Sequence, residues 1–254
     1  MRKRKAAEYK LANTFERREI KYLLTPAQRG ELLSAAGERL REDRYGWQDI
    51  CNVYFDTPDD RLIRTSLEKP VYKEKLRLRS YGVAGETDDV FFELKKKYNG
   101  IVYKRRAVMA YREALAFASG ADILRDGQIL RELRYFLDTT KVVPRLYLAY
   151  RRIAYTDEEG KLRVTFDTDI VSRRSELGLD AGIYGAPLFE KPRFLMEIKA
   201  PGALPLWLCR ILSELKLYPT SFSKYGRIFE REQEIRYTGP EEVQTEVKPC
   251  LTVS

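Results

Sequence analysis

Charged and apolar side chains alternate along most of the extended segments of this chain, and this alternation limits its possible folds more than any other feature. In the segment 71–81, Lys73, Lys75, Arg77 and Arg79 are separated by single residues. Successive side chains of a β-strand point to opposite faces, so these four cations share one face and the interleaved leucines occupy the other. The pattern predicts a strand with one cationic and one apolar face.

The same spacing recurs in other segments and creates further charged rows. The rows join Arg17, Glu19 and Lys21; Glu93, Lys95 and Lys97; Lys104 and Arg106; Arg163, Thr165 and Asp167; and Glu197 and Lys199. Short polar turns, such as Tyr98-Asn99-Gly100, separate strands that are adjacent in sequence and indicate antiparallel pairing. We therefore expect an α+β fold built on an antiparallel β-barrel with flanking helices.

The periodicity also predicts where the elements lie. Strands are expected at 15–23, 50–56, 71–81, 90–98, 101–110, 145–156, 162–169 and 193–199. Helices are expected from Thr25, which begins a capping box with Gln28, and at 112–119, 128–138 and 206–215. No linker interrupts the chain, so we predict one domain over 15–238, with a basic tail at 1–14 and a polar tail at 239–254.

The composition excludes several kinds of chemistry. The chain has no histidine, which rules out a Ser-His-Asp triad, a Cys-His pair and imidazole-ligated zinc. Its three cysteines have no CxxC spacing, so we expect neither a disulfide framework nor a zinc knuckle, but a reducing compartment. The remaining options use carboxylates, cations, hydroxyls and a hard metal ion.

The charge and hydropathy of the chain predict a cytoplasmic protein with an anionic partner. The formal net charge is +9, and no apolar run approaches the roughly 20 residues that span a bilayer. The motifs of sequence-specific nucleic-acid recognition are missing, so no specific nucleic acid is expected. A membrane-associated partner remains among the expected interactions.

The charged rows have two interpretations. They could be the solvated faces of an ordinary sheet packed on helices, which is the better interpretation for any one strand. However, the rows contain few neutral polar residues, and two cations ~6 Å apart at an effective dielectric constant of ~20 repel by about 3 kcal/mol. If the charged faces point into a barrel, they form a cationic tunnel for a polyanion. Its carboxylates, Glu19, Glu93, Asp167 and Glu197, would pair with cations or hold Mg²⁺ or Mn²⁺.

An ordered series of short motifs resembles the VTC domain, the polyphosphate polymerase domain of the vacuolar transporter chaperone family, within the CYTH-like triphosphate tunnel metalloenzymes. The resemblance runs from about residue 15 to 229. Its motifs are Phe15-Glu16-Arg17, Tyr54-Phe55-Asp56-Thr57, Lys75-Leu76-Arg77-Leu78-Arg79, Phe92-Glu93-Leu94-Lys95, Tyr150-Arg151-Arg152, Arg163-Val164-Thr165-Phe166-Asp167, Met196-Glu197-Ile198-Lys199 and Phe222-Ser223-Lys224-Tyr225. It implies an antiparallel tunnel that binds triphosphate, and metal-dependent transfer of the γ-phosphate of ATP onto a polyphosphate chain.

The resemblance also implies roles for individual residues. The catalytic cations would be Lys21, Arg77, Arg79, Lys95, Arg152, Arg163 and Lys224. Substrate binding would add Lys104, Tyr150 and Ser223, together with Arg106 and Lys199, which are placed by strand parity. Glu197 would be the ligand of Mn²⁺ or Mg²⁺. Ser221 stands where the family can place a further lysine.

The expected substrates and partners are ATP, pyrophosphate and inorganic polyphosphate. Phosphoryl transfer requires positioning and charge neutralisation, which cations and a metal ion provide without a histidine. Two alternatives stay open. One is a metal-dependent tripolyphosphatase or nucleoside triphosphatase of the same superfamily, and the other is a non-catalytic polyphosphate-binding module.

Overall fold

The computed structural model describes residues 17–99, 101–123 and 126–238. The predicted tails, 1–14 and 239–254, lie outside the described residues, and the domain boundaries stay a prediction. The strands are β1 (Arg17–Leu24), β2 (Arg41–Glu42), β3 (Gln48–Asp56), β4 (Tyr72–Tyr81), β5 (Asp89–Tyr98), β6 (Ile101–Ala110), β7 (Val143–Thr156), β8 (Arg163–Arg173), β9 (Ala186–Pro187) and β10 (Phe194–Pro201). The helices are α1 (Pro26–Ala36), the 3-10 turn Gly37–Arg39, α2 (Arg61–Leu67), α3 (Tyr111–Ala118), α4 (Gln128–Thr140), α5 (Leu206–Glu214) and α6 (Lys224–Thr238).

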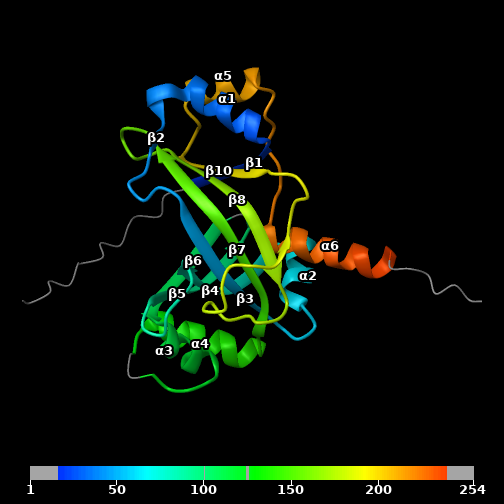
Figure 1. Ribbon diagram of the computed structural model, residues 1–254. Coiled ribbons are helices and arrows are strands. Elements are labelled where there is room, and N and C mark those ends of the chain that lie inside the picture. The colour runs from blue at the N-terminus through cyan, green and yellow to red at the C-terminus, as the bar shows by residue number, and fades with distance from the viewer. Residues whose placement is uncertain (1–16, 100, 124–125, 239–254) are drawn as a thin grey trace, which may run out of the picture.

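The strands form one curled antiparallel sheet, in the order β1-β10-β8-β7-β3-β4-β5-β6, with β2 paired to β7 and β9 to β8. Figure 1 shows α1 and α5 at one end of this sheet, α3 and α4 at the opposite end, and α2 and α6 to one side. Within the described ranges no strand pairing joins β1 to β6, so the sheet is open along this seam. The predicted antiparallel α+β fold is confirmed, with a curled half-barrel in place of a closed one.

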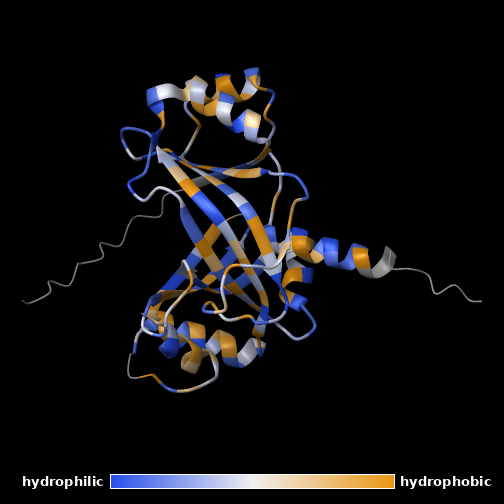
Figure 2. Cartoon of the chain, in the orientation of Figure 1, coloured by the Kyte–Doolittle hydropathy of each residue, from blue (hydrophilic) through white to orange (hydrophobic). Residues whose placement is uncertain are grey.

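The alternation in the sequence gives the sheet two different faces. Figure 2 shows hydrophilic and hydrophobic residues alternating along its strands. The convex side carries two apolar cores. In one core Leu76, Leu78 and Phe92 pack with residues of α3 and α4, and in the other Val164 and Ile198 pack with residues of α1 and α5. The charged rows consequently lie on the concave side, as the parity of the strands predicts.

The start of α1 follows the predicted capping chemistry. The amide of Gln28 donates to Thr25 Oγ1 at 3.2 Å, and the amide of Thr25 donates to Gln28 Oε1 at 2.9 Å. Pro26 occupies the first turn, where its missing N–H costs no hydrogen bond. The predicted helix start is therefore correct.

Two helices that the sequence pattern does not predict, α2 and α6, pack on part of the concave face. They form a third apolar core with the inward residues of β3 and β7, in which Phe222, Ile228 and Phe229 are buried. Fully burying one such side chain contributes about 1.5–3 kcal/mol. Gly226 permits the close approach, because a Cβ atom at this position would lie 3.0 Å from Leu67 Cδ2. The concave face is thus charged along one part and filled with apolar side chains along the other.

Candidate functional site

The charged part of the concave face begins with three adjacent strands, β4, β5 and β6. The strand register places Glu93 of β5 between Arg77 of β4 and Arg106 of β6. Two residues further along β5, Lys95 lies between Lys75 of β4 and Lys104 of β6. We call these six residues the β4–β6 wall. Its cations come from side chains that alternate with the buried leucines of the convex core, so the wall follows directly from the sequence pattern.

Glu93 is the hydrogen-bonded centre of the β4–β6 wall. Arg77 donates to Glu93 Oε2 from Nε at 2.9 Å and from Nη2 at 2.7 Å, and Arg106 Nε donates to Oε1 at 2.7 Å. Lys104 Nζ also lies 2.7 Å from Oε1. Burial alone would raise the pKa of Glu93, but Arg77 and the other cations hold it well below its usual range. The carboxylate stays ionised and fixes the orientation of the cations.

The opposite side of the site combines β1, β7, β8 and β10 with the beginning of α6. Asp167 of β8 is fully buried and accepts from Arg152 Nη2 at 2.7 Å and from Lys224 Nζ at 2.5 Å. Burial would raise the pKa of Asp167, but Lys224 and Arg152 lower it. We call Asp167, Glu197, Arg152, Lys21, Lys199 and Lys224 the β10–α6 wall.

Glu197 differs from the other buried carboxylates of the site. It is 7 % exposed, and among the described residues it accepts no hydrogen bond. The nearest cations are Lys21 Nζ at 3.4 Å, Lys199 Nζ at 3.7 Å, Arg152 Nη2 at 3.8 Å and Lys224 Nζ at 3.9 Å. Burial would raise the pKa of Glu197, but the surrounding cations, Lys224 foremost, hold it far below its usual range. The carboxylate is therefore charged and available to a further ligand.

Thr165 provides a second sign of an incomplete polar environment beside Glu197. The two residues are directly opposite each other on β8 and β10. Thr165 is 1 % exposed, and its Oγ1 has no hydrogen-bond partner among the described residues. A buried hydroxyl without a partner costs about 1–3 kcal/mol, so a water molecule or ligand oxygen at this position would be stabilising.

The segment that leads into α6 joins the two walls. Lys21 Nζ donates to Phe222 O at 3.0 Å, and Lys75 Nζ donates to Ser223 Oγ at 3.0 Å. Ser223 Oγ also accepts from the amide of Gly226 at 3.2 Å and so caps the first turn of α6. At the far side of this turn the hydroxyl of Tyr225 donates to Asp56 Oδ2 at 3.1 Å. These contacts fix Lys224 at the inner end of the site.

The structure brings together most of the residues that the sequence predicts for the site. Those on the concave face or at the start of α6 are Lys21, Arg77, Arg79, Lys95, Lys104, Arg106, Tyr150, Arg152, Glu197, Lys199, Ser223 and Lys224. Arg79 Nη2 donates to the hydroxyl of Tyr150 at 3.2 Å, and Lys224 Nζ lies 4.4 Å from the centre of the Tyr150 ring. Arg163 lies apart at the rim, where it donates to Asp43 Oδ2 at 3.1 Å and is 45 % exposed. The roles of all these residues stay predictions.

Three further residues belong to the site and were not assigned to it from the sequence. Asn52 Oδ1 accepts from Arg79 Nε at 2.9 Å and orients the guanidinium. Burial opposes ionisation of the Tyr54 hydroxyl, but Arg77 and the neighbouring cations lower its pKa to about 8. Burial and the adjacent lysines lower the pKa of Lys75 to about 8 as well. The continuous row from Lys73 to Arg79 was the available signal for Lys75, whereas Asn52 and Tyr54 lie in an apolar strand that carries no charge pattern.

A metal ion in this site would have few protein ligands. Within the described ranges, no group of three or more His, Cys, Asp or Glu residues is arranged to hold a metal ion. Mg²⁺ is commonly bound by one or two carboxylates together with substrate phosphates and water, and this donor set matches Glu197. The buried carboxylate of Glu197, which accepts no hydrogen bond among the described residues, and the unpartnered Thr165 hydroxyl thus fit a metal ion that binds together with a phosphate ligand.

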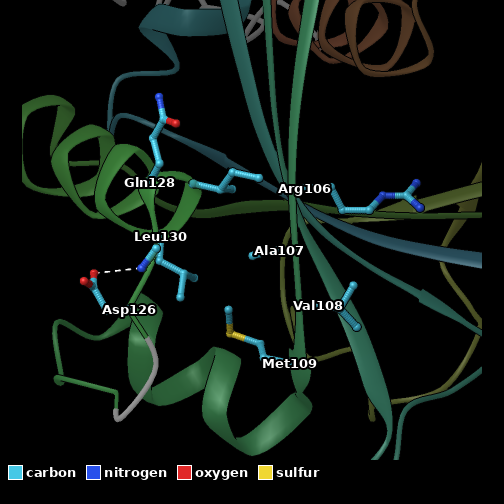
Figure 3. Close-up of a pocket in the computed structure, with 9 residues that line it drawn as sticks. Arg106, Ala107, Val108, Met109, Asp126, Gln128 and Leu130 are labelled. Carbon is cyan, nitrogen blue, oxygen red and sulfur yellow. Dashed lines mark hydrogen bonds between the residues drawn. The ribbon is translucent and has the colours of Figure 1, made fainter. Parts of the chain in front are cut away.

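A cavity beside β6 does not coincide with this site. It has a volume of about 650 Å³ and lies between β6 and the beginning of α4. Figure 3 shows Ala107 and Met109 on the side of the strand that faces the helices, with Arg106 and Val108 pointing away from it. Arg106 therefore borders this convex-side cavity through its backbone while its guanidinium belongs to the concave site.

The curled antiparallel sheet brings cations together around buried carboxylates on its concave face, an arrangement that can bind a polyanion. The chain belongs to the VTC domain family, whose profile matches residues 16–230. The family and the fold class inferred from the sequence motifs are thus confirmed. No curated protein sequence matches the chain.

Solved structures with a similar fold are distant in sequence. A Bacillus halodurans protein provisionally assigned as an adenylate cyclase has 17% identity and a TM-score of 0.51, covering 81% of this chain and 92% of its own. A Hippeastrum protein provisionally assigned as an adenylyl cyclase, with a dominant triphosphatase activity, has 17% identity and a TM-score of 0.49, covering 84% of this chain and 95% of its own. At this identity, the first likeness identifies the fold alone. In the described part of the chain, no helix is long and apolar enough to cross a membrane.

Proposed function

We propose that this protein is an ATP-dependent polyphosphate polymerase. The observation that carries the proposal is the convergence of two cationic walls on one concave site in a chain of the VTC domain family. Arginine binds phosphate oxygens in a bidentate manner, and lysine neutralises them as a point charge. Cations from both walls can therefore contact one linear phosphate chain along its length.

The reaction is an in-line phosphoryl transfer. A terminal oxygen of the polyphosphate chain attacks the γ-phosphorus of ATP, a new P–O–P bond forms, and the bond to the β-phosphate oxygen breaks to release ADP. The attacking oxygen is already ionised, so the step needs no protein base. Arg77 and Arg106, fixed by Glu93, and Arg152 and Lys224, fixed by Asp167, would hold the phosphates and neutralise the charge that develops during transfer.

A divalent cation belongs to the proposal as a cofactor. Glu197 would hold Mn²⁺ or Mg²⁺ together with phosphate oxygens, because it is the buried carboxylate of the site that accepts no hydrogen bond among the described residues. When bound, the ion would supply charge neutralisation at phosphate oxygens. Lys21 and Lys199 beside Glu197 would repel the ion, so an anionic phosphate ligand would have to bind with it.

The products distinguish the proposed polymerase from the alternatives. Purified protein is incubated with ATP, pyrophosphate primer and either Mn²⁺ or Mg²⁺, and ADP, orthophosphate and polymer are measured. The proposal expects ADP together with a polymer that exopolyphosphatase digests. Orthophosphate release without chain growth would instead identify a triphosphatase, and binding of tripolyphosphate without turnover would identify a non-catalytic module.

A double substitution tests whether the concave site binds the phosphate ligand. Arg77→Ala with Arg79→Ala should abolish tripolyphosphate binding, measured by isothermal titration calorimetry. The matched control is Arg131→Ala with Arg227→Ala, which removes two arginines that are 68% and 56% exposed and pair with surface carboxylates. Far-UV circular dichroism checks that both variants fold. Unchanged binding in the first variant would contradict the site assignment.

A further inference from the structure

Three lysines extend the cationic row beyond the two walls. Lys73 on β4 and Lys97 on β5 are direct cross-strand partners, and both share the parity of Arg77 and Glu93. Lys69 lies three residues before β4 and has a φ of 55°, a left-handed conformation that is uncommon for lysine. We call Lys69, Lys73 and Lys97 the lysine extension. It continues the concave face at the end where β4 begins and β5 ends.

The lysine extension continues a run of cations that, in the described part of the chain, have no carboxylate partner. Arg77 is held by Glu93 at 2.7 Å, whereas Lys75 and Lys95, which lie between Arg77 and the lysine extension, are in no ion pair among the described residues. Within the described ranges, no carboxylate lies within 4.0 Å of the ammonium groups of the lysine extension, and Lys73 Nζ donates only to the backbone oxygen of Ser66 at 3.1 Å. Burial lowers the pKa of Lys73, and Lys97 and Lys69 lower it further by repulsion. Lys73 and Lys97 are directly opposite each other, and like charges in such positions destabilise a sheet. A bound anion would remove this repulsion.

The spacing of the row suits an extended anion. At a rise of about 3.3 Å per residue, the six steps along the strand from Arg79 to Lys73 correspond to about 20 Å. A linear phosphate chain that follows β4 meets Arg79, Arg77, Lys75 and Lys73 in succession. A triphosphate held between Arg77 and the β10–α6 wall leaves the lysine extension uncovered, whereas a longer chain reaches it.

The nearby aromatic residues argue against a single-stranded nucleic acid as this anion. Tyr72 and Tyr98 are exposed, but their parity places them on the opposite face of the sheet from Lys73 and Lys97. Proteins that bind single strands use aromatic side chains beside the cations, so that bases can stack on them. The lysine extension itself, where the two cross-strand lysines have no aromatic side chain on their own face from Tyr72 or Tyr98, matches a polymer that carries only phosphates.

We propose that the lysine extension is a secondary binding site for the part of a polyphosphate chain that lies beyond the triphosphate-binding walls. This inference rests on the proposed function, since it assumes that polyphosphate occupies the concave site. It assigns the end of the site at which the polymer leaves, namely the end formed by the start of β4 and the end of β5. It also makes affinity depend on chain length.

The test compares two ligands and two variants. Binding of tripolyphosphate and of long-chain polyphosphate is measured by calorimetry at several salt concentrations. The variant K69Q/K73Q/K97Q should bind tripolyphosphate as the wild type does, which also shows that it is folded. Its affinity for the long chain should fall at least about tenfold. The plot of log affinity against log salt concentration should become less steep by about two units, as expected for three lost contacts with a single-stranded polyanion.

The control variant is K161Q/K191Q/K216Q, which removes three exposed lysines from the β7–β8 turn, the segment before β10 and the segment after α5. It should retain the affinity of the wild type for both ligands. The inference is overturned if the control loses as much long-chain affinity as K69Q/K73Q/K97Q, if K69Q/K73Q/K97Q loses none, or if it loses tripolyphosphate affinity equally. It is also overturned if a single-stranded oligodeoxynucleotide competes as well as long-chain polyphosphate. A wild type that shows the length-dependent binding but makes no polymer would refute the proposed polymerase and leave the lysine extension established.

Discussion

Glu93 on the β4–β6 wall and Glu197 on the β10–α6 wall occupy comparable positions and have different surroundings. Both are buried, with 2% and 7% exposure, and cations hold the pKa of each far below its usual range. Glu93 accepts hydrogen bonds from Arg77 and Arg106. Glu197, among the described residues, has cations only at 3.4 Å or more. Glu93 is hydrogen-bonded by the cations that it orients, whereas Glu197 is charged and, in the described part of the chain, accepts no hydrogen bond.

The strand register explains this difference. Glu93 has an arginine directly opposite it on each neighbouring strand, and both guanidinium groups reach back to its carboxylate. Glu197 has Thr165 on one side and Lys21 on the other. The threonine is short, and Lys21 donates instead to the backbone oxygen of Phe222 at 3.0 Å. The identity of two cross-strand neighbours can thus leave a carboxylate in a cationic site without hydrogen bonds.

The largest expected effect is on stability, from Glu93→Gln. Removing the charge of the buried Glu93 leaves the half-buried Arg77 without its ion pair, and breaking a buried pair typically costs about 3–5 kcal/mol. Urea unfolding of the ligand-free protein measures the loss. The control is Glu132→Gln, which breaks more exposed pairs with Lys96 and Arg105 and should cost about 1 kcal/mol or less. Equal losses in the two variants would contradict the organising role of Glu93.

Glu197→Gln should act on metal binding more than on stability. It removes the proposed metal ligand without breaking a hydrogen bond. Mn²⁺ should therefore bind the protein–tripolyphosphate complex about 100-fold more weakly, as expected from the 10- to 100-fold losses seen for supporting residues of metal sites. Calorimetric titration of Mn²⁺ measures this without turnover. The free energy of unfolding should fall by less than in Glu93→Gln. Unchanged Mn²⁺ affinity would show that Glu197 is not a metal ligand.

Raising the pH should weaken ligand binding and stabilise the empty protein. Lys75, Lys104 and Tyr54 each have a pKa of about 8, which for each is below its value in an unfolded chain. Above pH 8 the lysines lose positive charge and the tyrosine gains negative charge, so tripolyphosphate affinity should fall roughly tenfold between pH 7 and 9. The unfolded state binds more protons than the folded state between about pH 8 and 10, so the stability of the ligand-free protein should rise in that window.

The same titration has an internal control. Lys104→Arg keeps its charge at pH 9 and should flatten the decline in affinity while preserving binding at pH 7. Calorimetry across the pH range, with urea unfolding in parallel, gives both quantities. Affinity that is constant from pH 7 to 9 would show that these three groups do not face the ligand.

The sequence predicted which face of the sheet each strand side chain occupies better than it predicted which helices pack on those faces. The parity of Arg77, Arg79, Glu93 and Lys104 placed them on one surface, because a strand leaves each side chain only two directions. The helix α6 was not predictable in this way, because its sequence carries many charges and a glycine at position 226. Its location was not predictable either, because its apolar side packs on inward residues of β3 and β7 that are far away in the chain. The ion-pair partners depend on register between strands, which no local pattern specifies.

The smallest expected effect concerns Arg163 at the rim of the site. Its guanidinium is 45 % exposed and pairs with Asp43, whereas Arg152 is 17 % exposed and pairs with the fully buried Asp167. Exposed ion pairs contribute about 0–1 kcal/mol, so Arg163→Ala should lower the free energy of unfolding by less than about 1 kcal/mol and tripolyphosphate affinity by about threefold or less. Arg152→Ala, which leaves Asp167 with one cation fewer, should lower both quantities several times more, as measured by urea unfolding and calorimetry. If Arg163→Ala instead matched Arg152→Ala in tripolyphosphate affinity, the bound chain would have to extend past the β10–α6 wall to the rim, and the contrast between rim and interior would no longer hold.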